Sequence, residues 1–197
     1  GGVMARRRLG QDSIGFAHIG DGATSTGDFH EAVNFAAVRG VPVILLIENN
    51  HYAYSTPSKD QYRCKRLVDR AIGYGIEGHS ADGNDATTLY PLLLDIAADI
   101  RVNPRPVLVD CDTMRMRGHG EHDDFFYAPK ALLEKYAKRD PVAQLKTHLL
   151  ENGLLSKSDS EKLEVAVTEQ VTAAYKEALE DPLPNPATLL DGVYAGG

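Results

Sequence analysis

Two short polar segments each follow an apolar run, and their residue types suit a metal-bound phosphate group. Asp21 comes after the apolar residues 13–19, and Asn50 comes after the apolar residues 43–47. If both runs form neighbouring parallel strands, these side chains lie at the carboxyl edge of one sheet, where ligands bind in such folds. A carboxylate, an amide oxygen and the backbone carbonyls of the turn after Asn50 are hard donors that suit octahedral magnesium. The pattern therefore predicts a magnesium diphosphate site.

The small residues after Asp21 would let an anion approach the backbone. Gly22, Ala23 and Thr24 lead into an expected helix, whose N-terminal amides and dipole favour negative charge. Each piece alone is a weak signal, because a Gly-Asp-Gly segment most often forms only a turn. It is the combination of Asp21 and Asn50, 29 positions apart, that favours a phosphate site.

A second polar segment, residues 115–124, contains two glycines and two histidines. It follows the last expected strand, and a loop held by a rigid sheet often binds ligands. The alternative is an ordinary solvated surface segment. His119 and His122 are three positions apart, as in part of a metal clip, but no further ligand at suitable spacing supports zinc. Hydrogen bonding to Asp123 or Asp124 would give His122 a purely structural role.

The elements that must position these residues alternate between strands and helices. This order predicts an α/β fold, a mostly parallel sheet with helices on both faces. Asp82-Gly83-Asn84-Asp85 is interpreted as a turn with a helix cap. The expected strands cover 13–19, 43–47 and 106–109, and the expected helices run from Phe29 to Gly40 and from the cap Asp85 to Ile100.

After residue 127 the pattern becomes helical. We expect an α/β domain over 1–127, a helical extension over 128–180 and a Pro-rich tail over 181–197. Pro129 and Pro141 suit the first residues of helices, and Ser158 with Glu161 suits a capping box. The last helix carries an apolar stripe that we expect to be covered by a partner. The stripe consists of Leu163, Val167, Val171, Ala174 and Ala178.

The composition excludes several classes of function. Lys and Arg number 21 against 28 Asp and Glu among 197 residues, and the net charge of −7 repels nucleic acid. The longest apolar run, 41–47, is too short to span a membrane, and we see no export signal. Cys64 and Cys111 match no disulfide framework or metal spacing, which suits a reducing compartment. We expect the cytoplasm of a bacterium or, in a eukaryote, the mitochondrial matrix.

Gly20-Asp21-Gly22 followed by Glu48-Asn49-Asn50 resembles the motif of thiamine diphosphate enzymes. The stretches GDGATSTGDFHEAVNFAAVRGVPVILLIENNHYAYSTP and GYGIEGHSADGND are very similar to the alpha subunit of the decarboxylating first component of 2-oxo acid dehydrogenase complexes. The resemblance extends from about Gly1 to about Lys176. It implies the thiamine-diphosphate-binding fold, decarboxylation of a 2-oxo acid and transfer of the acyl group to a lipoyl arm of the acyltransferase component.

Carried over position by position, the resemblance implies a set of cofactor contacts. The side chains of Asp21 and Asn50 and the backbone carbonyl of Tyr52 would bind Mg²⁺. Gly22 and Ala23 would contact the diphosphate. These positions agree with the donors inferred from the residues themselves.

The resemblance also assigns roles to other loop positions. His119 matches the histidine that lies near the cofactor and is needed for acyl transfer, so it is our candidate catalytic residue. Arg115 and Arg117 would supply positive potential beside it. Tyr54 stands where an aliphatic residue or Met commonly supports the bent cofactor. Gly120 replaces the serine that is phosphorylated in mammalian members, so that switch is absent at this position.

The family resemblance implies partners as well. A beta subunit would supply the glutamate that activates the aminopyrimidine, in an α2β2 assembly, and the lipoyl domain of the acyltransferase would receive the acyl group. The family's alpha subunit has a long part before the position of Gly1, so we expect this chain to be a fragment or a processed piece, inactive alone.

Several functions remain open at this point. The segments NNHYAYSTP, QY and GYGI favour the branched-chain type, with pyruvate or acetoin dehydrogenase as alternatives. Transketolase and acetohydroxyacid synthase share the cofactor motif but not the RGHGEHDD loop or the KRDPV segment. A different class of function is a non-catalytic assembly subunit with a vestigial metal site.

Overall fold

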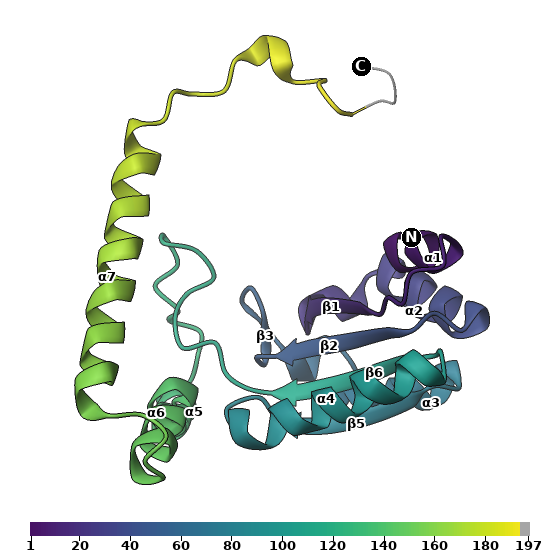
Figure 1. Cartoon of the computed structure of the whole chain (residues 1–197), viewed down its shortest axis with the longest axis horizontal. Coiled ribbons are helices and arrows are strands. Elements are labelled where there is room, and N and C mark those ends of the chain that lie inside the picture. Colours follow the sequence, from purple (N-terminus) through teal and green to yellow (C-terminus); the bar gives the residue numbers. More distant parts are fainter. Residues whose placement is uncertain (194–197) are drawn as a thin grey trace. The chain divides into compact units, whose positions relative to one another are not determined.

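Four parallel strands form the central sheet of the computed structural model, which describes residues 1–193 (Figure 1). In spatial order they are β1 (Gly15–Gly20), β2 (Val43–Asn49), β6 (Pro106–Asp112) and β5 (Glu77–Asp82). Helices α2 (Gly27–Arg39) and α3 (Arg70–Tyr74) pack on one face, and α4 (Ala86–Val102) packs on the other. The expected parallel sheet with helices on both faces is therefore confirmed.

Short elements surround this sheet. A two-stranded antiparallel hairpin follows β2, and 3-10 helices lie in the loops. Pro141 begins its helix as expected, whereas Pro129 precedes its helix, which begins at Lys130. These elements are α1 (Gly2–Arg8), η1 (Gly22–Ser25), β3 (Tyr52–Ala53), β4 (Thr56–Pro57), η2 (Ser58–Asp60), η3 (Leu67–Asp69), α5 (Lys130–Ala137), α6 (Pro141–Glu151), α7 (Lys157–Glu180) and η4 (Pro186–Thr188).

Local signals fix the ends of the two long sheet-covering helices. The Thr26 side chain caps α2 by accepting a hydrogen bond of 3.4 Å from the amide of Phe29. Gly40 ends α2 with a φ of 57°, a left-handed conformation that glycine adopts without strain. Asp85 caps α4 by accepting from the amide of Thr87 at 3.0 Å, as expected.

The core lies on both faces of β2 and β6, the two strands that have a neighbour on each side. Ile47 and Leu108 face α2 and α3, whereas Val107 and Val109 face α4, and all four are fully buried. Cys111 lies in the second of these clusters, and burial raises the pKa of its thiol to about 12. Both runs of branched residues are thus strands buried on two faces, as the sequence predicts.

Strand β5 was not expected from the sequence. The segment 82–85 was interpreted as a turn and cap only, but Asp82 ends a strand that pairs with β6 along its length. This strand contains polar residues and Gly78 and so lacks an apolar pattern, because an edge strand needs few apolar side chains. Gly78 is required there, since a Cβ would lie 2.7 Å from Val68 and 2.8 Å from Ala71.

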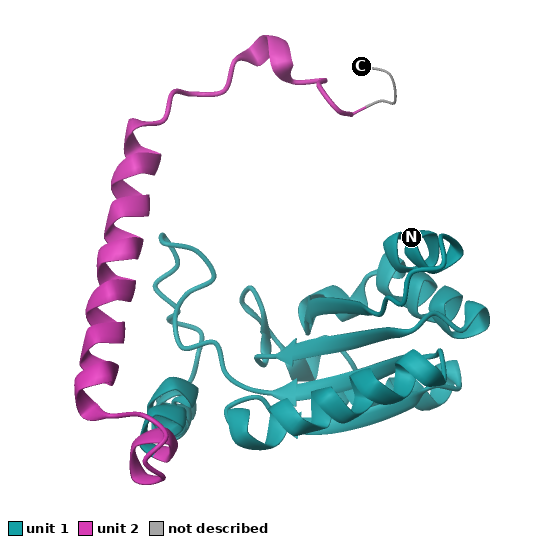
Figure 2. Cartoon of the chain, viewed as in Figure 1, with its two compact units in different colours: residues 1–147 teal, residues 148–197 magenta. Residues whose placement is uncertain are grey.

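The chain divides into two compact units, residues 1–147 and residues 148–197 (Figure 2). The domain bounds expected at 127 and 180 stay predictions, and residues 194–197 of the expected tail lie outside the described part. The second unit contains the long helix α7, whose residues Leu163, Val167 and Val171 are exposed.

The expected capping box of Ser158 and Glu161 is wrong. Ser156 is the N-cap of α7, and its hydroxyl oxygen accepts a 3.0 Å hydrogen bond from the amide of Asp159. The same hydroxyl donates to the Asp159 carboxylate at 2.7 Å. The helix therefore begins two residues earlier than Ser158 would allow, because Ser156 has an acidic residue at the same spacing and bonds to it.

We predict that Ser156→Ala destabilises the start of α7 by about 1 kcal/mol, because it leaves the Asp159 amide without its partner. The matched variant Ser158→Ala should change the same quantity by no more than a few tenths of a kcal/mol, because Ser158 lies inside the helix. Amide hydrogen exchange across residues 157–161 measures both effects. Equal acceleration in the two variants would contradict the assigned cap.

Candidate functional site

The parallel pairing of β1 with β2 brings Asp21 and Asn50 to the same edge of the sheet. Gly20 is in register with Glu48, so the turn after β1 begins beside the end of β2. The Glu48 carbonyl accepts hydrogen bonds from the amides of Asp21 at 3.3 Å and Asn50 at 3.0 Å. Two segments distant in the sequence are therefore tied to one backbone oxygen.

Asp21 is a buried carboxyl group that no Lys or Arg neutralises. Its exposed fraction is 1%, and Gln61 donates to its Oδ2 at 3.3 Å. Burial raises the pKa of Asp21, and hydrogen bonds from Gln61 and the Asn50 amide oppose that rise. Within residues 1–193, no Lys or Arg forms an ion pair with this group. Such an environment fits a bound cation, which would supply the missing positive charge.

The turn after Asp21 is tightly packed. A Cβ on Gly22 would lie 2.5 Å from the Cβ of Ala53 in the hairpin, so only glycine fits. Thr24 is fully buried, and both its amide and its hydroxyl donate to the Asp21 carbonyl, at 3.2 Å and 2.6 Å. Residues 22–25 form the 3-10 helix η1, so the amide of Thr24 is already used and α2 begins only at Gly27.

The hairpin after β2 presents the other expected donors. The side-chain oxygen of Asn50 accepts a 3.2 Å hydrogen bond from the amide of Tyr52, which fixes the amide group and leaves a second lone pair. The Tyr52 ring is buried with Met114, Phe125 and Tyr136. The backbone that carries the Tyr52 carbonyl is therefore held by packing as well as by the hairpin.

The loop between β6 and α5 is held by a chain of hydrogen bonds that ends at His119. The Arg115 guanidinium donates to the carbonyl of Tyr54 and to the hydroxyl of Tyr127, each at 2.7 Å. That hydroxyl donates to Asp123 at 2.6 Å, and the same carboxylate oxygen accepts from the backbone amide of His119 at 2.7 Å. The Tyr127 hydrogen bond is the largest cause of the lowered pKa of Asp123.

Tyr54 brings the hairpin into contact with both loop histidines. Its ring meets the His119 ring edge-on, with centroids 5.1 Å apart, and its hydroxyl lies 3.4 Å from Nε2 of His122. The expected bond from His122 to Asp123 or Asp124 is thus replaced by a contact with Tyr54. Gly118 permits the loop to turn, because a Cβ there would lie 1.9 Å from the Asp123 carbonyl oxygen.

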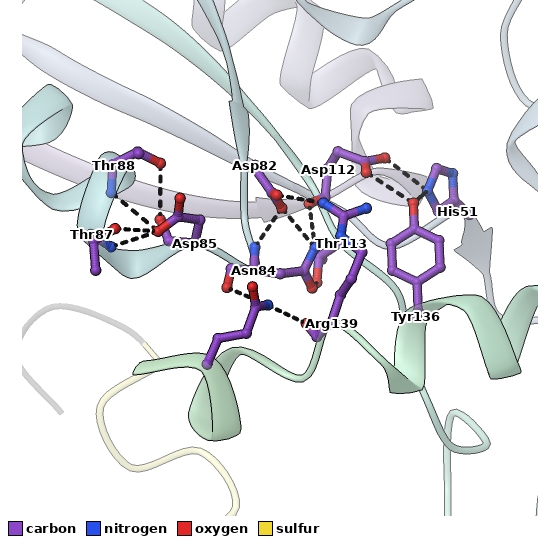
Figure 3. A network of polar contacts seen from close by, with 11 residues as sticks. His51, Asp82, Asn84, Asp85, Thr87, Thr88, Asp112, Thr113, Tyr136 and Arg139 are labelled. Atoms are coloured by element: carbon purple, nitrogen blue, oxygen red, sulfur yellow. Dashed lines mark hydrogen bonds and ion pairs between the residues drawn. The ribbon is translucent and has the colours of Figure 1, made fainter. Parts of the chain in front are cut away.

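No pattern in the sequence indicates the polar network around His51. The His51 side chain contacts Asp112 at the end of β6 and Tyr136 on α5, as Figure 3 shows. The same holds for Gln61, whose link to Asp21 spans 40 positions. No local pattern marks either contact, because each joins residues from separate elements.

A cavity of about 500 Å³ opens beside this network, at the carboxyl ends of β2, β5 and β6. His51, Asp112 and Cys64 are among its lining residues. The lining oxygens Asn49 Oδ1 and Ser58 Oγ are buried and have no hydrogen-bond partner within the protein. The cavity therefore offers polar groups to water or to a ligand.

Two other features are absent among residues 1–193. No three or more His, Cys, Asp or Glu side chains are grouped to hold a metal ion. The expected Mg²⁺ set has a different composition, with one carboxylate, one amide oxygen and one backbone carbonyl. In the same part of the chain, every helix is too short or too polar to cross a membrane.

Residues 1–187 match the family described as "Dehydrogenase E1 component". The chain is 35% identical to the 2-oxoisovalerate dehydrogenase subunit alpha of Bacillus subtilis, over 98% of this chain and 59% of that protein. It is 39% identical to the 3-methyl-2-oxobutanoate dehydrogenase subunit alpha of Mycobacterium tuberculosis, over 89% and 46%.

A further relative is the pyruvate dehydrogenase E1 component subunit alpha of Rickettsia bellii, 33% identical over 98% of this chain and 59% of that protein. The chain thus spans between 46% and 59% of the length of these relatives.

The packing of η1 against the hairpin predicts the effect of a single methyl group. Gly22→Ala should lower the free energy of unfolding by about 1–3 kcal/mol, because Ala53 must move to accommodate the new Cβ. Gly20→Ala is the matched control, since a Cβ there meets nothing within 4 Å. Urea unfolding of both variants measures the difference, and equal stabilities would contradict the close approach of the two turns.

Proposed function

Because the chain belongs to the dehydrogenase E1 component family, we propose that it serves as the alpha subunit of a thiamine-diphosphate-dependent 2-oxo acid dehydrogenase. Such an enzyme decarboxylates a 2-oxo acid and passes the acyl group to a lipoyl arm. The observation that carries this proposal is the buried, cation-free carboxyl of Asp21, tied beside Asn50 through the Glu48 carbonyl. The names of the B. subtilis and M. tuberculosis relatives favour a branched-chain substrate.

The donor set suits Mg²⁺ in both number and charge. Asp21 would supply the only carboxylate, Asn50 its free lone pair, and Tyr52 its carbonyl, leaving positions for phosphate oxygens and water. Gly22 and Ala23 would border the diphosphate. Tyr54 would support the cofactor, and His119, whose ring contacts that of Tyr54, would lie near it. When bound, thiamine diphosphate supplies the carbanion chemistry that breaks the bond to the carboxylate.

The residues of this chain would orient the reactants and transfer a proton near the acyl group. The Asp123 carboxylate accepts a hydrogen bond from the His119 amide and so holds that backbone, and Tyr54 packs against the His119 ring. The exposed imidazole is therefore presented from a fixed loop toward an incoming acceptor. An imidazole held in this way can act as a general acid or base. Arg115 is committed to the loop contacts, so Arg117 is the exposed positive charge nearby.

We assign the remaining parts of the activity to partners. A beta subunit, in an α2β2 assembly, would complete the cofactor site, and the lipoyl domain of an acyltransferase would accept the acyl group. The exposed stripe of α7 would lie against such a partner. The location would be the bacterial cytoplasm, or the mitochondrial matrix in a eukaryote.

The proposal is tested by turnover of this alpha subunit assembled with a beta subunit. We expect activity that requires Mg²⁺ and thiamine diphosphate, with 2-oxoisovalerate preferred over pyruvate and acetoin. Preference for pyruvate would move the assignment to the pyruvate-specific type, as in the R. bellii relative. Cofactor binding without turnover of any of the three would favour a non-catalytic assembly subunit.

Asp21→Asn should have opposite effects on the metal-free and the loaded protein. Burial raises the pKa of Asp21 above its unfolded value, so the native state binds more protons between these two pKa values. The stability of the metal-free wild type therefore falls as pH rises through that window. Asn has no charge to bury, so the metal-free variant should be more stable than wild type at neutral pH and less dependent on pH.

In the assembled enzyme, the same variant should bind thiamine diphosphate with Mg²⁺ at least ~100-fold more weakly, because the only charged ligand is lost. Thermal unfolding between pH 4 and pH 8 measures the first effect, and titration calorimetry measures the second. Wild-type cofactor affinity in Asp21→Asn would refute the proposed metal site.

His119→Ala should depress acyl transfer more than decarboxylation. An artificial electron acceptor reports decarboxylation, and the complete complex with lipoyl domain reports transfer. We expect a loss of about 100-fold in the second assay and a smaller loss in the first, with cofactor affinity nearly unchanged. His122→Ala is the control, since it removes a neighbouring imidazole that also contacts Tyr54. Equal losses in the two assays would remove the catalytic role.

A further inference from the structure

His51 has an unusual backbone conformation at an important place. Its φ is 71°, in the left-handed region, although it is not glycine. It lies between Asn50 and Tyr52, the two hairpin residues proposed to hold the cation. For a residue with a Cβ this conformation costs about 1–2 kcal/mol, and it persists only where surrounding contacts hold it.

Two polar partners hold the His51 side chain. Its Nε2 lies 2.9 Å from Oδ1 of Asp112 and 3.0 Å from the hydroxyl oxygen of Tyr136 (Figure 3). The Tyr136 hydroxyl donates its single proton to Oδ2 of Asp112 at 2.9 Å. The oxygen of Tyr136 can therefore only accept from His51, so Nε2 must carry a proton that it shares between the two partners.

Both partners belong to regular secondary structure of the first compact unit. Asp112 is the last residue of the inner strand β6, and Tyr136 is a buried residue of α5. Arg139 lies over the Tyr136 ring, 5.4 Å from its centroid, and forms an ion pair with Asp82 at the end of β5. The hydrogen bond from His51 is the largest cause of the lowered pKa of Asp112.

We infer that His51 is a positioning residue, whose ring anchors the Asn50–Tyr52 turn to β6 and α5 and so places the two oxygen donors before a cation binds. This inference rests on the proposed function. A turn that is already ordered loses less conformational entropy on binding, so the affinity for the cation rises. The anchored ring thereby offsets the strain of the left-handed backbone.

Four variants test the anchor. Tyr136→Phe removes one hydroxyl but keeps the buried ring. His51→Ala removes the anchor and keeps the backbone strain, whereas His51→Gly removes both. His79→Ala is the control, because His79 also contacts a carboxylate, Glu77 at 2.7 Å, but lies on the edge strand β5.

Two measurements are made on each variant in the assembled alpha and beta subunits. The first is the Mg²⁺ concentration that half-saturates thiamine diphosphate binding, by titration calorimetry. The second is amide hydrogen exchange at residues 50–54 without metal, where the Tyr52 amide bonded to Asn50 reports the order of the turn.

We expect His51→Ala and Tyr136→Phe to raise the half-saturating Mg²⁺ concentration about 10-fold and to speed exchange at Tyr52, with turnover at saturating Mg²⁺ close to wild type. His51→Gly should be weaker than wild type but better than His51→Ala. His79→Ala should change neither measurement.

Wild-type values of both quantities in Tyr136→Phe and His51→Ala would overturn the inference, as would a His51→Gly protein that binds Mg²⁺ at least as well as wild type. If the wild-type assembly itself showed no Mg²⁺-dependent binding, the proposed function would fail. The exchange measurement would still decide separately whether His51 orders the turn.

Discussion

The parallel register of β1 and β2 is the constraint on which the candidate site depends. Strands that run in the same direction end at the same edge, so Gly20 and Glu48 stand beside each other and the chain after each must share that edge. The single carbonyl of Glu48 then receives amides from both continuations. The turn with Asp21 and the turn with Asn50 therefore hold each other, and neither could move without breaking a bond to β2.

The site combines a stable scaffold with locally unfavourable groups. A carboxyl is buried without a cation, a histidine has a left-handed backbone, and buried oxygens lack partners. Each feature lowers the stability of the metal-free chain, and together they lie around one edge of the sheet. Strained and unsatisfied groups concentrated in this way are typical of binding sites. The apolar clusters on β2 and β6 supply the stability that tolerates them.

The sequence predicts those parts of the structure that depend on local patterns. The runs at β2 and β6 are recognisable because strands buried on two faces must be continuously apolar, and α2 and α4 because their caps and apolar periodicity agree. β5 could not be predicted from the sequence, because it is a strand through its hydrogen bonds to β6 and not through an apolar side-chain pattern.

The same distinction applies to the site. Asp21 and Asn50 follow strands and are therefore recognisable. The contact of Gln61 with Asp21 crosses 40 positions, and that of His51 with Tyr136 crosses 85 and starts from a left-handed residue, so neither has a local signal. The N-cap of α7 was misplaced by two residues, because Ser156 and Ser158 are each followed by an acidic residue three positions later.

The two cysteines differ in burial, so a thiol reagent can label one of them selectively. Cys111 is shielded in the core and its pKa is raised to about 12, so the reactive thiolate is almost absent at neutral pH. Cys64 is only half-buried and lines the cavity that also contains His51. An alkylating or fluorescent reagent would therefore attach to the folded chain at one place, next to the carboxyl edge of the sheet. The rate of that attachment would report, without any assay of turnover, whether the cavity is open or occupied.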